Sequence, residues 1–125
     1  MKEKILFADD SPVIKKIVKR AIESKNFEFL EASDGKEALE VLTKEYKNIV
    51  LVLSDWNMPV MNGFDFLKAV KANATFKGIP VIMITTEAEK SHIIKAVQAG
   101  AANYIIKPFN SEDLITKVMQ CLGRK

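Results

Sequence analysis

The sequence is poor in cysteine, glycine and proline, and it has no long apolar run. Its one cysteine, Cys121, excludes a disulfide within the chain and suits a reducing compartment. No apolar stretch approaches the roughly 18 residues that a membrane-spanning helix requires. The apolar run near the N-terminus, residues 5–8, is too short for a signal peptide. We therefore expect a cytoplasmic protein that does not insert into a membrane.

A strong charge of either sign is also missing, since the formal net charge is only +3. The one basic cluster, residues 15–20, alternates with apolar residues, which is typical of the solvated face of an amphipathic helix. No base-stacking aromatic residues or nucleic-acid-binding motif accompany it. We therefore expect no binding to nucleic acid.

Short apolar runs alternate with helical patterns along the whole chain of 125 residues, which we interpret as one domain, 1–125. The runs predict strands at 4–8, 28–32, 49–54, 79–84 and 104–106. A helical spacing of apolar residues follows each run, and in the first helix it includes Val13, Ile14, Ile17, Val18, Ala21 and Ile22. Five strands alternating with five helices predict an α/β fold, with a parallel sheet covered by helices on both faces.

Polar residues mark where the helices begin. Ser11 is a suitable N-cap and Pro12 fits the first helical position. Asp34 and Glu37 have capping-box spacing, and Asn62 is a third candidate cap.

Chemically useful side chains follow four of the five predicted strands. Asp9 and Asp10 come after the first strand, and Asp55 comes after the third. Thr85 and Lys107 follow the fourth and the fifth. Because parallel strands end at the same edge of the sheet, we expect these residues to meet at one site. No glycine-rich phosphate-binding loop follows the first strand, which argues against a nucleotide site of the Rossmann or P-loop type.

Three carboxylates at one site need positive charge nearby. Two carboxylates about 4 Å apart repel by about 4 kcal/mol at an effective dielectric constant of about 20. Lys107 supplies one positive charge, and an oxygen-seeking divalent ion would supply the rest. The candidate ligands include no histidine or cysteine, so zinc and copper are disfavoured. We predict a Mg²⁺ site, in which Mn²⁺ could replace Mg²⁺.

A carboxylate can also attack phosphorus and form an aspartyl phosphate. Asp55 is the best candidate nucleophile, because it follows the central buried strand and lies between the other groups. Lys107 and the metal would neutralise the phosphoryl oxygens, and Thr85 could donate a hydrogen bond to one of them.

These residues resemble the receiver domain of two-component response regulators over essentially the full chain, and the chemotaxis members of that family most of all. The motifs that carry the resemblance are Asp9-Asp10-Ser11, Ser54-Asp55-Trp56-Asn57-Met58-Pro59, Met61-Asn62-Gly63, Thr85-Thr86-Glu87-Ala88, Gln98-Ala99-Gly100-Ala101 and Lys107-Pro108-Phe109. The resemblance implies a flavodoxin-like (βα)5 fold, doubly wound, with strand order 2-1-3-4-5.

The resemblance also implies roles for the acidic residues and their neighbours. Asp55 would be the phosphoacceptor and would bind Mg²⁺ together with Asp10 and the backbone carbonyl of Asn57. Asp9 would hold a metal-bound water. Lys107 would contact the phosphoryl group, and its peptide bond to Pro108 would be cis.

Further residues would read or tune the phosphorylated state. Thr85 would move toward the phosphoryl group and Tyr104 would turn inward, which would alter the face made by the fourth helix, the fifth strand and the fifth helix. Asn57, Thr86 and Glu87 would tune the reaction.

The family implies a phosphoacceptor switch rather than an enzyme with a separate substrate. A histidine kinase would donate the phosphoryl group, and a phosphatase could remove it. After the last predicted helix only residues 123–125 remain, so we expect output through binding of another protein by a monomer. The chemotaxis-like motifs favour the flagellar-motor switch as that target.

Three alternatives remain. The chain could be a phosphorelay intermediate that passes phosphate to a histidine phosphotransfer protein. It could be a Mg²⁺-dependent phosphohydrolase with an aspartyl nucleophile, although Asn57 stands where such enzymes usually have a second acid. A flavodoxin-like flavin binder would need a phosphate-binding loop after the first strand, where Asp9 and Asp10 would repel phosphate.

Two aromatic residues have different expected environments. Trp56, the only tryptophan, is next to Asp55, so its fluorescence should report on Mg²⁺ and phosphate there. His92 falls in a helical pattern away from the acids, and we expect an ordinary surface histidine.

Overall fold

One parallel sheet forms the centre of the molecule. The structure is a computed structural model that describes residues 2–86 and 90–124, and Glu87, a predicted tuning residue, lies outside them. The strand order is β2-β1-β3-β4-β5, which confirms the predicted fold class and topology. The strands are β1 Lys4–Ala8, β2 Glu28–Ala32, β3 Ile49–Asp55, β4 Val81–Thr86 and β5 Asn103–Lys107.

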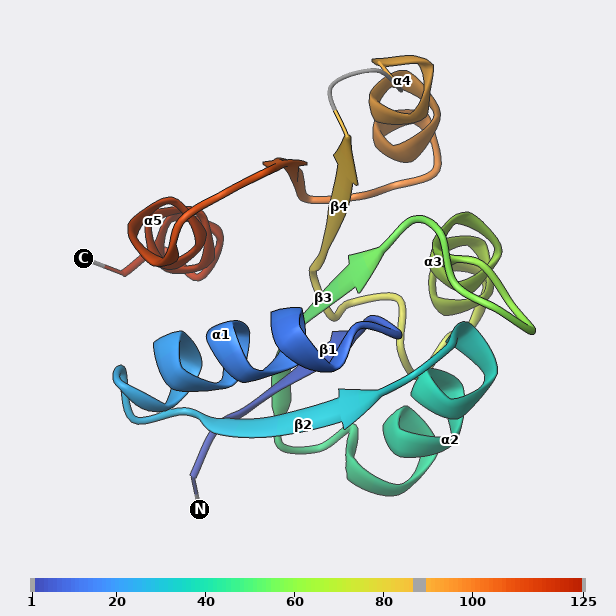
Figure 1. Ribbon diagram of the computed structural model, residues 1–125. Helices are drawn as coiled ribbons and strands as arrows, with labels where there is room; N and C mark the ends of the chain where they lie inside the picture. Colours follow the sequence, from blue (N-terminus) through green and yellow to red (C-terminus); the bar gives the residue numbers. More distant parts are fainter. Residues whose placement is uncertain (1, 87–89, 125) are drawn as a thin grey trace.

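Helices cover both faces of this sheet. Helices α1 and α5 lie on one side, and α2, α3 and α4 lie on the other (Figure 1). Their bounds are α1 Pro12–Glu23, α2 Gly35–Glu45, α3 Gly63–Ala72, α4 Lys90–Gln98 and α5 Ser111–Cys121. None of the helices among the described residues has the length and apolar character needed to cross a bilayer.

The predicted N-caps are present. The Ser11 hydroxyl accepts a hydrogen bond from the backbone N–H of Ile14 at 3.4 Å. The Asp34 carboxylate and the Asn62 amide oxygen each accept one at 2.8 Å from the N–H three residues further on. These side chains satisfy backbone donors that have no partner within the helix, so they fix where α1, α2 and α3 begin.

Strand β1 shows how the sheet divides the core. Leu6 and Ala8 belong to the apolar cluster under α2 and α3, whereas Ile5 and Phe7 belong to the cluster under α1 and α5. All four side chains are fully buried, as expected for a strand that is covered on both faces. The continuous apolar runs in the sequence reflect this double burial.

Two details differ from the sequence-based expectation. Strand β4 begins at Val81 rather than at Ile79, since Pro80 has no N–H to donate to a neighbouring strand. In α1, Val13 is 67% exposed and Ile17 is 42% exposed, although both fit the predicted apolar stripe. The stripe that α1 buries is therefore narrower than the apolar pattern suggested.

Candidate functional site

The register of the sheet brings the acidic residues together. Ala8 pairs with Ser54 across β1 and β3, so the next residues, Asp9 and Asp55, lie at the same level of the sheet. One carboxylate oxygen from each of Asp9, Asp10 and Asp55 lies within 4.8 Å of the other two. This cluster is the acidic site, and it lies at the carboxyl edge of the sheet, where α/β folds commonly bind ligands.

Asp9 is the most deeply buried of the three acids, with 1% of its surface exposed. Its Oδ1 accepts a hydrogen bond from the Ser11 N–H at 2.8 Å. Its Oδ2 is buried and accepts no hydrogen bond from the described residues, and Lys107 Nζ lies 3.6 Å away. A buried carboxylate oxygen without a hydrogen bond is costly, so Asp9 Oδ2 fits a site meant for a further positive ligand.

Asp55 ends the central strand and is 7% exposed. Its Oδ1 accepts a hydrogen bond from the Trp56 N–H at 2.9 Å and lies 3.2 Å from Lys107 Nζ. Burial raises the pKa of the Asp55 carboxyl above its ordinary value, the Lys107 ammonium opposes that rise, and the nearby Asp9 charge adds to it. The ionised form of Asp55 is therefore less stable in this site than the ionised form of an exposed aspartate.

Lys107 reaches the acids from the edge strand. It pairs with Thr86 in the register of β4 and β5, and its side chain is 26% exposed. The Lys107–Pro108 peptide bond is cis. Lys107 contacts Asp9 and Asp55, two of the three clustered carboxylates, and every candidate ligand atom of the cluster is oxygen. The residues present therefore fit a hard divalent cation such as Mg²⁺ and do not fit a thiolate- or imidazole-preferring metal.

The other predicted site residues have distinct positions. Thr85 is buried at the end of β4, whereas Thr86 is exposed next to it. Asn57 is exposed and lines a shallow crevice together with Asp10. Tyr104 is half-buried on β5, and the ammonium of Lys117 lies 5.0 Å from the centre of its ring.

The loop after Asp55 is held by close backbone approaches that were not predicted from the sequence. The Gly63 N–H donates to the Trp56 carbonyl at 2.8 Å, and a Cβ at Gly63 would collide with the Asp55 carbonyl group. Val60 has φ of 66° and is 80% exposed, which is unusual for a β-branched residue. The glycine in Asn62-Gly63 was the available signal, whereas nothing in the sequence marks Val60.

His92 was expected to be an ordinary surface histidine, and this expectation is wrong. Its ring is half-buried and stacks on the ring of Trp56, with 4.0 Å between centroids and 6° between planes. Phe64, in the first turn of α3, also stacks on Trp56. Trp56 is thus a packed residue next to the acidic site.

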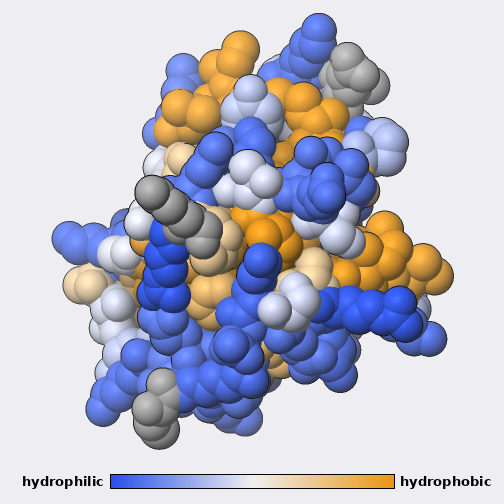
Figure 2. All heavy atoms as spheres, turned by 90° about the vertical axis from the view of Figure 1, so that its left-hand side faces the viewer, coloured by the Kyte–Doolittle hydropathy of each residue, from blue (hydrophilic) through white to orange (hydrophobic). Residues whose placement is uncertain are grey.

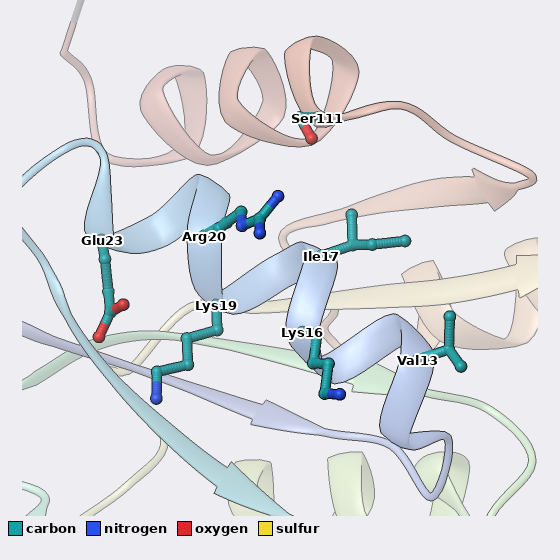
Figure 3. Close-up of a pocket in the computed structure, with 7 residues that line it drawn as sticks. All are labelled: Val13, Lys16, Ile17, Lys19, Arg20, Glu23 and Ser111. Carbon is teal, nitrogen blue, oxygen red and sulfur yellow. The ribbon is translucent and has the colours of Figure 1, made fainter.

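A groove larger than the crevice beside Asp10 lies between α1 and the start of α5. Figure 3 shows its lining, in which Ser111 of α5 lies across the groove from α1. Figure 2 views this side of the molecule, where hydrophilic side chains predominate with apolar ones between them. All seven lining side chains are exposed, and Glu23 is the one carboxylate among them. This groove therefore lacks the paired, buried acids that give the acidic site its chemistry.

Known proteins share both the sequence and the fold. The pattern described as "Response regulator receiver domain" matches residues 5–119. "Chemotaxis protein CheY1" of Helicobacter pylori is 45% identical over 121 residues, which cover 96% of this chain and 97% of that protein. "Chemotaxis protein CheY homolog" of Campylobacter jejuni is 40% identical, with 96% of this chain and 92% of that protein covered. Among solved structures, the chemotaxis response regulator CheY4 of Vibrio cholerae superposes with a TM-score of 0.86 at 34% identity, covering 97% of this chain and 99% of that one.

Proposed function

The chain belongs to the response regulator receiver domain family, and we propose that it is a chemotaxis switch that accepts a phosphoryl group on Asp55. One observation carries the proposal: the Lys107 ammonium lies 3.2 Å from the buried Asp55 carboxylate and 3.6 Å from Asp9 Oδ2, a buried oxygen that accepts no hydrogen bond from the described residues. The Helicobacter relative matches over 97% of its own length, which supports a single-domain switch. We place its action in the cytoplasm.

Asp55 has the properties of the phosphoacceptor. An oxygen of its carboxylate would form the new O–P bond as the N–P bond of a phosphohistidine in the donor kinase breaks, and the leaving imidazole would take up a proton. Lys107, whose Nζ is 3.2 Å from Asp55 Oδ1, is placed to balance the negative charge of the incoming phosphoryl oxygens. Water attacking the phosphorus would later release inorganic phosphate and restore the carboxylate.

The remaining acids would hold the cation. Asp10 and Asp55 would bind Mg²⁺ directly together with the Asn57 carbonyl, and Asp9 would hold a water on the ion, with Mn²⁺ as a substitute. A bound Mg²⁺ would supply positive charge to the phosphoryl oxygens. Asp9 supports this arrangement, because its buried Oδ2 accepts no hydrogen bond from the described residues and could accept one from such a water.

The output surface would be the face made by α4, β5 and α5. Thr85 and Tyr104 belong to the neighbouring strands β4 and β5, so a movement of Thr85 toward the phosphoryl group would alter the space around Tyr104. Thr86 and Glu87 would tune this step. The face exposes Ile94, Val97 and Ile106, which suits it to bind a protein. The names of the relatives give chemotaxis as their role. The target we propose is the flagellar-motor switch, with a histidine kinase as donor and a phosphatase as a further partner.

The experiment that tests the proposal is labelling with a small phosphodonor and Mg²⁺, followed by intact mass spectrometry. Wild type should gain one phosphoryl group and Asp55→Asn should gain none. Asp65→Asn, a change of an exposed aspartate on α3, is the matched control and should label like wild type. Equal labelling of Asp55→Asn would remove Asp55 from its role. Pull-down with motor-switch protein, with and without the phosphodonor, would then separate a motor switch from a phosphorelay intermediate.

A further inference from the structure

Three stacked rings connect α3, the end of β3 and α4. The Trp56 ring lies 5.0 Å from Phe64 at 12° and 4.0 Å from His92 at 6°, measured between centroids and between planes. The Lys68 ammonium lies 4.6 Å from the centre of the Phe64 ring. Trp56 is only 7% exposed, so its ring is enclosed by these neighbours rather than lying on the surface. This set of three rings, Phe64, Trp56 and His92, is the aromatic column.

Trp56, the middle residue of the column, contacts the acidic site through its backbone N–H. The Trp56 N–H lies 2.9 Å from Asp55 Oδ1 and 3.1 Å from the Ile84 carbonyl of β4, so it is shared between the carboxylate and the sheet. The Trp56 carbonyl accepts from Gly63 at 2.8 Å. A change in the charge or size of the Asp55 side chain therefore alters a hydrogen bond of the residue that carries the indole.

Helix α4 buries few other side chains among its described residues. Ala96 is its one buried side chain, while Ile94 and Val97 are 62% and 57% exposed. His92 lies in the first turn of α4, which Figure 1 shows beyond the carboxyl end of β4. The imidazole that stacks on Trp56 therefore makes a direct contact between the start of α4 and the residue next to Asp55.

We propose that His92 is a positioning residue that couples α4 to the acidic site through its ring contact with Trp56. The coupling uses the flat shape of the side chain at position 92, because a ring can follow a displacement of the indole while a small side chain would lose contact. The signal that it transmits rests on the proposed function, namely phosphorylation of Asp55. The contact itself is a property of the resting protein and can be tested without phosphorylation.

The test compares His92→Ala, His92→Phe and wild type, with Lys95→Ala on the exposed side of α4 as the matched control. Hydrogen exchange of α4 is measured first without phosphodonor. In His92→Ala, exchange in the first turns of α4 should rise roughly two- to tenfold, the range expected on loss of one stacked ring pair. His92→Phe should restore wild-type exchange, and Lys95→Ala should leave it unchanged. Emission from Trp56, the only tryptophan, should change in His92→Ala, because its stacked neighbour is gone.

The second measurement adds a small phosphodonor and Mg²⁺. Wild type and His92→Phe should show a change in α4 exchange on labelling, and His92→Ala should label normally while losing most of that change. The proposal is overturned if α4 of His92→Ala exchanges and responds like wild type, or if His92→Phe behaves like His92→Ala. Failure of wild type to label would instead refute the role of Asp55, and the resting exchange rates would still decide the role of His92.

Discussion

Replacement of Lys107 by methionine tests the electrostatic account of the acidic site. Methionine keeps much of the length and apolar stem of lysine but removes the ammonium that, among the described residues, lies within 4 Å of both Asp9 and Asp55. We expect Lys107→Met to be less stable than wild type at pH 8 in the absence of divalent cations. The loss should shrink when Mg²⁺ is added, since a bound cation would replace the missing positive charge.

The magnitude follows from the two distances. Pairs of unit charges at 3.2 Å and 3.6 Å each attract by about 5 kcal/mol at an effective dielectric constant of about 20. Most of this is cancelled by the cost of desolvating the ammonium, which is still 26% exposed. We expect a net loss of about 2 kcal/mol, between the values for exposed and for buried pairs. With the usual dependence of unfolding free energy on urea, the urea concentration at which half of the protein is unfolded should fall by about 1 M.

The pH dependence gives the sharper test. Burial raises the pKa of Asp55 above 3.8, and Lys107 counteracts this rise, so Lys107→Met should raise that pKa further. An acid whose pKa is raised by folding binds its proton more tightly in the native state, so its ionisation lowers stability as pH rises through the interval between the two pKa values. The unfolding free energy of the variant should therefore be closest to that of wild type near pH 4 and furthest below it at pH 8.

Urea unfolding followed by far-UV circular dichroism at both pH values measures this difference. Lys95→Met, which removes an exposed lysine of α4, is the control and should change stability by less than about 0.5 kcal/mol at either pH. An equal loss at pH 4 and pH 8 would mean that Lys107 acts through packing of its stem. No loss at pH 8 would mean that the three carboxylates do not need its charge.

Three further outcomes are expected. Val60→Asn should stabilise the protein by about 1 kcal/mol in thermal unfolding, because asparagine tolerates a positive φ better than valine, and an equal gain from Val13→Asn on α1 would show that φ is not the cause. Gly63→Ala should cost about 3 kcal/mol or more in urea unfolding and reduce labelling by a small phosphodonor, since the new Cβ would displace the Asp55 carbonyl, and wild-type labelling would contradict this. Without divalent cations, Asp55→Asn should be more stable than wild type at pH 8 but not near pH 4, because burial raises the pKa of Asp55, and a loss at pH 8 would contradict that direction.

Local patterns were sufficient to predict most of the fold. The apolar runs located all five strands. The runs are most continuous in β1, β3 and β4, because these strands are buried on both faces. The strand order came from a family resemblance rather than from the runs, since order depends on which strands pair. The pattern also put Val13 and Ile17 on the apolar face of the first helix. Both are exposed, because periodicity shows which residues share a helix face but not how much of that face a neighbour covers.

The acidic site was predictable to the same degree. Asp9, Asp55 and Lys107 each stand at or just after the end of a strand. Because parallel strands run in one direction, this position was enough to predict that the three residues meet at one edge of the sheet. The contact between His92 and Trp56 could not be predicted in this way, since it depends on where α4 lies relative to the end of β3. Such contacts join residues that are far apart in sequence and have no shared periodicity.

Several local features of the site lower stability, and they have a common consequence. Asp9 Oδ2 is buried and accepts no hydrogen bond from the described residues, and Asp55 is buried with a raised pKa. Val60, in the loop between Asp55 and Gly63, has a strained backbone. The excess positive charge of the chain does not relieve the acids, because much of it lies in the exposed basic cluster of α1. A ligand that brings positive charge to this edge therefore gains binding energy from relief of the repulsion among the acids as well as from new contacts. We accordingly expect Mg²⁺ to raise the unfolding free energy of wild type more than that of Asp55→Asn, in which one of the repelling charges has already been removed.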